Sequence, residues 1–191
     1  MAIAGNLAQF KKSYKKKWLW PKMRFSESGP KLKIQDISSL PFYVSDQHAA
    51  FLLWRNGGVP EMKWYAAKQF AFEIDFFYGI GSDYDLQEYL LVFRNDLPRF
   101  AVPIAVVSNY LGDPSLLLTF PHDYRNLGHG RDTKVWFYTW GHEEVASEDQ
   151  LRSLELVAPS IKGLISRLKE KPPRKYRLLG TGESVDGDAN E

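Results

Sequence analysis

Histidines are the first residues in this sequence that could do chemistry. Histidine acts as a general acid or base near neutral pH and is a common zinc ligand. None of the histidines forms a His-Glu-x-x-His helix, and no serine stands in a Gly-x-Ser-x-Gly turn. In "GHEE", His142 precedes Glu143 and Glu144, but further ligands cannot be named, so a surface turn is favoured over a metal or acid–base site. The histidines are His48, His122, His129 and His142.

Carboxylates add little evidence for catalysis. Asp83, Asp85 and Glu88 stand at the start of an expected helix, where they complement the positive end of its dipole. The stretch "GIGSD" lies between a strand and a helix but lacks the third glycine of a dinucleotide-binding turn. We therefore expect a protein that is not an enzyme, with no catalytic residues, no cofactor and no metal.

The stretch "FLLWRNGGVP" predicts the end of a helix rather than a phosphate loop. Val44 to Arg55 carry apolar residues at helical spacing, and Ser45 or Asp46 can cap the first turn. Asn56 and Gly57 tolerate the left-handed conformation that closes a helix, and Gly58 lets the chain reverse. A phosphate loop needs its glycines before a helix, so a structural turn is favoured.

Composition indicates a globular binding protein rather than a disordered or disulfide-rich one. The chain has 191 residues, 44% of them hydrophobic and 15% aromatic, which fits one domain with a substantial core. A net charge of +2 does not argue for nucleic acid, and no direct nucleic-acid partner is expected. The absence of cysteine, of a signal peptide and of an apolar run long enough for a membrane favours a cytoplasmic protein without a membrane partner.

The N-terminal residues 6–20 predict an amphipathic helix that Pro21 ends. Its lysines alternate with Tyr14, Trp18 and Trp20, which is superficially typical of a surface for anions. A solvated helix face whose apolar stripe packs on the domain is the favoured interpretation.

Alternating and helical patterns predict an α+β fold for the rest of the chain. In the strand expected at 70–78, Phe77 is placed on the solvent face with Glu73 and Asp75. Pro103 indicates an edge strand or a bulge. For the helix after Gly81, Ser82 or Asp83 is the expected cap, and Tyr84, Leu86, Leu90 and Leu91 form its apolar stripe. Further strands are expected at 100–110, 115–120 and 133–140, with a short extended piece at 31–34.

The C-terminal part is expected to hold one more helix and then a tail. Residues 147–171 have helical apolar spacing, with Pro159 as a kink or break. Residues 172–191 have the composition of a disordered acidic tail. The predicted organisation is therefore one domain over 1–171, including the basic N-terminal helix, and a tail over 172–191.

Four stretches, taken in order, resemble the SUKH superfamily, which includes cell-wall-assembly regulators of the Smi/Knr type. They are "FLLWRNGGVP", "IDFFYGIGSDYDL", "LPRFAVPIAVVSNYLGDPSLLLTF" and "VWFYTWGHE", and they span 40–144. The resemblance implies a single domain with a twisted, mostly antiparallel sheet and flanking helices. It also implies that bacterial members are immunity proteins, which neutralise a cognate toxin that is often a nuclease. The partner would then be a toxin protein that is encoded nearby.

Such a role needs a preformed surface with aromatic anchors and charges opposite to those of the toxin. Because nucleases are basic where they hold phosphates, an acidic and aromatic patch is the expected binding face. Its candidate residues are Glu73, Asp75, Asp83, Tyr84, Asp85, Glu88, Trp136, Tyr138 and Glu143. The alternative is a regulatory or adaptor domain of the cell-wall-regulator type, in which the basic N-terminal helix contacts other partners.

Overall fold

In the computed structural model, the described residues are 20, 22–67, 70–108, 114–120, 134–139, 154–171, 175–178 and 184–186. The helices among them are α2 (Ile34–Ser38), α3 (Asp46–Trp54), α4 (Leu86–Phe93) and α6 (Ile161–Ile165), and the 3-10 turn η1 (Arg94–Asp96) follows α4. The strands are β1 (Phe25–Ser26), β2 (Val59–Pro60), β3 (Trp64–Ala67), β4 (Phe70–Phe77), β5 (Val102–Ser108), β6 (Pro114–Thr119), β7 (Val135–Thr139), β8 (Glu155–Ala158), β9 (Lys175–Leu178) and β10 (Ser184–Asp186). Helices and a mostly antiparallel sheet make this a single α+β domain, as the sequence predicts.

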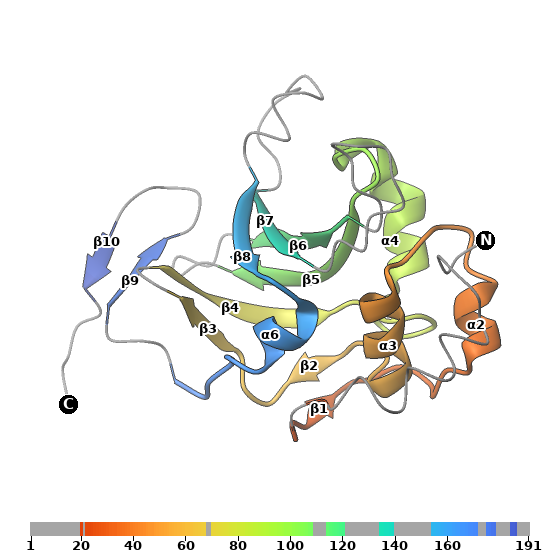
Figure 1. Ribbon diagram of the computed structural model, residues 1–191, viewed down its shortest axis with the longest axis horizontal. Helices are drawn as coiled ribbons and strands as arrows, with labels where there is room; N and C mark the ends of the chain where they lie inside the picture. The colour runs from red at the N-terminus through yellow and green to blue at the C-terminus, as the bar shows by residue number, and fades with distance from the viewer. Residues whose placement is uncertain are drawn as a thin grey trace.

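The main sheet is curled. Its strand order among the described residues is β10-β9-β4-β5-β6-β7-β8, with β3 also paired to β4, while β1 and β2 form a separate ribbon. Figure 1 shows the curve from β4 through β5 to β8, with α6 directly after β8 and α3 near the end of β4. The Tyr65 hydroxyl on β3 donates to the Val157 carbonyl on β8 at 2.7 Å. The rings of Phe72 on β4 and Phe137 on β7 lie 6.4 Å apart. Contacts between such distant strands show that the core fills the inside of the curve.

Helix α3 lies in this core. The Ser45 side chain accepts a hydrogen bond from the His48 amide and caps the helix, as the sequence predicts. The Gln47 side-chain oxygen accepts from the Ile161 amide at 2.6 Å, which joins α3 to the start of α6. Phe51 is fully buried. The helix is therefore fixed by hydrogen bonds in its first turn and by the buried Phe51 before the chain turns at Asn56.

Asn56 is a buried junction between three chain segments. Its side-chain nitrogen donates to the carbonyls of Pro30 at 2.9 Å and Ile80 at 2.6 Å, and its oxygen accepts from the Ile80 amide at 2.7 Å. Gly57 and Gly58 follow with φ of 71° and 99°, which side chains rarely adopt. A Cβ on Gly57 would lie 2.5 Å from the Gly79 nitrogen, so the two segments meet too closely for any other residue.

Asn56→Ala is expected to lower the free energy of unfolding by about 3 kcal/mol. The change removes three hydrogen bonds worth about 1 kcal/mol each, and the two bonds to Ile80 are buried. Urea unfolding of both proteins measures the difference. Asn95→Ala is the matched control, because Asn95 is exposed, and its unfolding midpoint should not move. If both variants lost a similar amount of unfolding free energy, this role for Asn56 would be contradicted.

Strand β4 differs from simple alternation because it contains a bulge. Ile74 pairs with Val107 and Phe76 with Val106, so Asp75 is an extra residue without an opposite partner. Beyond the bulge the faces exchange. Phe77 is fully buried, and the placement of Phe77 on the solvent face is therefore wrong. Pro103 marks a second shift, between Pro103 and Ala105 in the interior strand β5, so the proline indicates a bulge and not an edge.

Helix α4 begins later than predicted. Its cap is Asp85 rather than Ser82 or Asp83, and the Asp85 carboxylate accepts from the Gln87 amide at 2.7 Å and the Glu88 amide at 3.0 Å. Leu86 and Leu90 are buried, as predicted. Leu91 is wrongly placed in the apolar stripe, because 86% of it is exposed.

Three further segments differ from the sequence predictions. Within 31–34, residue 34 begins α2, and no strand forms there. Within 147–171, the described part begins at 154 and consists of β8 followed by α6, with Pro159 between them, rather than one helix. Within the expected tail 172–191, β9 pairs in parallel with β4, and β10 pairs with β9. The expected N-terminal helix lies outside the described residues, apart from Trp20, which stacks on Trp54 at a ring-centroid distance of 5.0 Å.

Candidate functional site

The acidic residues around the start of α4 form one surface with β4. The Tyr84 ring stacks on Phe76 of β4 at a centroid distance of 4.0 Å and 12°. The Tyr84 hydroxyl donates to the Glu27 carboxylate at 2.5 Å. Because of these contacts, Glu27 joins Asp83 and Glu88 beside a pair of stacked rings, although it is 57 residues distant from Tyr84 in sequence.

An aromatic row continues from this point beneath α4. We use this name for Tyr84, Phe76, Tyr78, Tyr89 and Phe93, whose successive rings lie 4.0, 5.3, 4.9 and 4.8 Å apart. Burial is the main cause that raises the pKa of Tyr78, and it raises that of Tyr89 to about 12. Both hydroxyls therefore stay neutral at physiological pH. The row is a rigid, uncharged support for the acidic residues at its edge.

The carboxylates beside the row have no cationic partner in the described part of the chain. From Asp83 to Phe93 the sequence has three carboxylates, on Asp83, Asp85 and Glu88, and no lysine or arginine. The ion pair that the described residues do contain joins Lys63 and Glu73, 3.7 Å apart. Asp83 and Glu88 are exposed. The surface at the start of α4 is consequently negative and open to a partner.

Several predicted binding residues also hold the fold. Asp85 is the α4 cap, and its carboxylate accepts from the Gly81 amide as well. Asp75 accepts from the Ser108 hydroxyl at 2.6 Å. Burial raises the pKa of Asp75, and the Ser108 hydrogen bond opposes that rise. Glu73 is paired with Lys63 on the neighbouring strand segment. These side chains are less free to contact a partner than Asp83 or Glu88.

The two predicted binding residues on β7, Trp136 and Tyr138, have different surroundings. Tyr138 lies towards the far end of α4, where its hydroxyl donates to the Asp96 carbonyl at 3.2 Å. Trp136 is half-buried, with the Lys134 ammonium 5.9 Å from its ring centroid. Glu143 lies outside the described residues, as do His122, His129 and His142.

Sequence reasoning missed Glu27, Phe76, Tyr89 and Phe93. The spacing of Tyr89 and Phe93, four residues apart on one helix, was a signal that they share a face. No local signal connects Glu27 to Tyr84.

Nothing in the described ranges resembles a metal centre: no three side chains of histidine, aspartate and glutamate gather there. Within those same ranges, no helix has the length and apolar character needed to cross a bilayer. Comparisons with known protein families, curated proteins and solved structures find no match.

Proposed function

We propose that this chain is an immunity protein of the SUKH superfamily that binds and neutralises a cognate toxin, without catalysis of its own. Two things support the proposal. The first is the ordered resemblance of the four stretches within 40–144. The second, which carries most weight, is the unpaired acidic surface of Asp83 and Glu88 beside the stacked rings of Tyr84 and Phe76.

This surface fits a basic partner physically. A toxin that holds nucleic acid phosphates presents lysines and arginines, and a complementary negative face speeds association with it. Tyrosine supplies large contact area with few rotatable bonds, so Tyr84 can anchor the complex at low entropic cost. The stack on Phe76 and the hydrogen bond to Glu27 hold its ring in place before binding. The proposed mechanism is occlusion of the basic site of the toxin by this face.

Reversing the two exposed charges, Asp83→Lys with Glu88→Lys, is expected to lower the association rate constant with the toxin about tenfold at low salt. Neither residue has a side-chain hydrogen bond or ion pair among the described residues, so the fold should persist. The measurement is surface plasmon resonance against the toxin encoded beside this gene, at several salt concentrations. Co-expression with the toxin supplies the cellular readout, and the variant should protect less well.

The matched control is Glu61→Lys with Glu170→Lys, which makes the same charge change at exposed positions away from α4. It should keep nearly full association rate and protection. Equal losses in both double variants would show that net charge, and not this face, determines binding. Failure of the unaltered protein to bind or to protect against any neighbouring toxin would remove the proposed function itself.

A further inference from the structure

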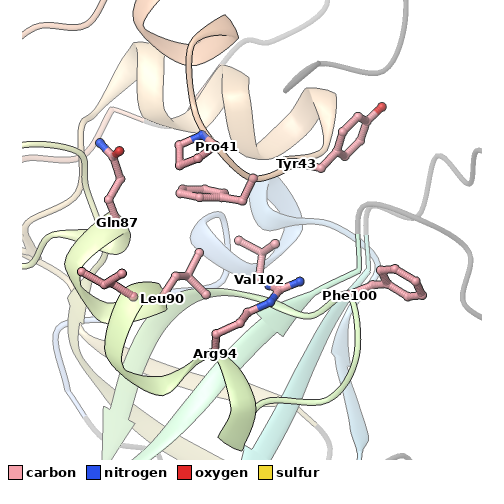
Figure 2. A pocket seen from close by; sticks show the side chains of 9 residues that line it. Pro41, Tyr43, Gln87, Leu90, Arg94, Phe100 and Val102 are labelled. Atoms are coloured by element: carbon pink, nitrogen blue, oxygen red, sulfur yellow. The ribbon is translucent and has the colours of Figure 1, made fainter.

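A groove lies along one side of α4. It has a volume of about 360 Å³ and is formed by the segment 41–43, one side of α4, and the chain from 100 to 102. We call it the α4 groove. Figure 2 shows Pro41 above Leu90, with Gln87 at one end of the groove and Phe100 at the other. Its volume is in the range of binding pockets and suits one or two side chains.

The walls of the α4 groove are apolar, and its single charge is positive. Pro41, Phe42, Leu90 and Val102 supply carbon surface, and the one ionised side chain lining the groove is Arg94. The guanidinium donates to the Ala101 carbonyl at 3.2 Å, which occupies one of its five N–H groups. No carboxylate among the described residues forms an ion pair with it. Figure 2 shows the Arg94 side chain reaching between Val102 and Phe100.

The backbone at Phe100 is held in an unusual conformation at the edge of this groove. Its φ is +66°, which is rare for an aromatic residue. The Arg94 hydrogen bond fixes Ala101, the residue after Phe100, and the Arg99 guanidinium lies 4.8 Å from the Phe100 ring centroid. Conformations of this kind persist where surrounding contacts enforce them, and they are frequent at ligand clamps. Here the enforced turn places Phe100 at the end of the groove away from Gln87.

The rim of the groove exposes apolar surface that a partner could cover. Leu91 is 86% exposed and lines the groove. The next residue, Val92, is 69% exposed and is not part of the groove lining. Large apolar side chains exposed next to a concave site mark contact surfaces more often than isolated ones do.

We propose that the α4 groove binds a segment of a partner protein in which an apolar side chain stands next to a carboxylate. The apolar side chain enters between Phe42 and Leu90, and the carboxylate pairs with Arg94. Charge complementarity selects this occupant, because a bidentate carboxylate matches the remaining guanidinium donors. The lysine-rich residues 1–19 of this chain would bring positive charge to a positive groove. The inference stands whether or not the acidic surface binds a toxin, since none of Asp83, Tyr84 and Glu88 lines the groove.

Three dipeptide probes test the charge preference on the full chain: acetyl-Phe-Glu-amide, acetyl-Phe-Gln-amide and acetyl-Phe-Lys-amide. Their binding is followed by ¹H–¹⁵N chemical-shift changes. The Glu probe should saturate with a dissociation constant on the order of 1 mM, as expected for a ligand of this size, and shift the amides of Leu90, Leu91 and Ala101. The Gln probe should bind about tenfold more weakly, and the Lys probe more weakly still, because the charge-assisted pairing is lost.

Variants separate the contribution of the groove from that of its surroundings. Arg94→Gln should reduce binding of the Glu probe to the level of the Gln probe, whereas Arg24→Gln, at an exposed arginine outside the groove, should not. Leu91→Gln should weaken binding of the Glu probe severalfold. Val92→Gln is the matched control, and it should leave binding of this probe unchanged. If Arg94→Gln does not fold, the preference among probes on the unaltered chain still decides the proposal. Equal binding of the three probes, shifts outside the groove, or displacement of the Glu probe by a peptide of residues 1–19 would overturn it.

Discussion

Phe77→Ala is expected to lower the free energy of unfolding by about 3–5 kcal/mol, the usual cost of truncating a buried phenylalanine. The Phe77 side chain is fully buried, and its ring lies 5.0 Å from that of Phe51 and 5.8 Å from that of Phe25, measured between centroids. Removing it leaves a cavity between β4 and α3 that these rings cannot close. Urea unfolding at pH 7, followed by tryptophan fluorescence and circular dichroism, measures the change.

The neighbouring residue supplies the control. Phe76 is half-buried on the opposite face, in the stack with Tyr84, so Phe76→Ala should cost only about 1–2 kcal/mol. Regular alternation along β4 would give the reverse order, with Phe76 in the core. A larger loss for Phe76→Ala than for Phe77→Ala would therefore show that β4 lacks the bulge at Asp75.

The existence of β4 follows from its residues, but its bulge does not. Alternating apolar and polar residues predict a strand because one face of a sheet is buried. The bulge at Asp75 depends on how β4 pairs with β5, a strand that begins 25 residues after β4 ends. At Pro103 a local signal existed, since proline cannot donate a ladder hydrogen bond, but it left an edge strand and a bulge both open. Asp75 has no backbone property that would indicate a bulge. Phe77 was therefore predicted on the solvent face instead of in the core.

Helix and strand were confused where apolar runs are short. The segment 155–158, "ELVA", fits either structure, and only its pairing with β7 decides for a strand. The tail shows the same limitation, because β9 owes its position to pairing with β4 and not to apolar content of its own. In the candidate site, the charges of Asp83 and Glu88 were evident from the sequence. The aromatic row beside them depends on contacts between residues that are distant in sequence. A sequence pattern does not contain such contacts.

Residue spacing on α4 explains how one helix presents two different surfaces. Gln87, Leu91 and Arg94 follow each other at intervals of four and three, and all line the α4 groove. Glu88 follows Gln87 and stands three residues before Leu91, so it lies on the helix next to the rim of the groove, whereas the Tyr89 and Phe93 rings belong to the aromatic row. A single eight-residue helix therefore carries a negative side chain beside a groove whose lining charge is positive.

His48 is expected to make the protein sensitive to acid. The side chain is fully buried on α3, and neither ring nitrogen has a hydrogen-bond partner in the described part of the chain. Burial lowers the pKa of His48 to about 3, whereas in the unfolded chain it is about 6.5. As the pH falls below 6.5, the unfolded state binds a proton that the folded state does not, so stability is complete above this pH and decreases below it. The slope is about 1.4 kcal/mol per pH unit, which amounts to about 3 kcal/mol between pH 8 and pH 4.

His48→Leu isolates this contribution, because leucine has a similar volume and no proton to bind. At pH 8 the variant should be at least as stable as the unaltered chain, since it also removes two buried polar atoms without partners. The difference between the two free energies of unfolding, measured in urea at each pH unit from 8 to 4, should grow in favour of the variant below pH 6.5. Asp75, whose pKa burial raises, and the other titrating groups act equally in both proteins and cancel in the difference. Parallel stability curves would mean that folded His48 accepts a proton as readily as the unfolded chain does, which contradicts its full burial without a hydrogen-bond partner among the described residues.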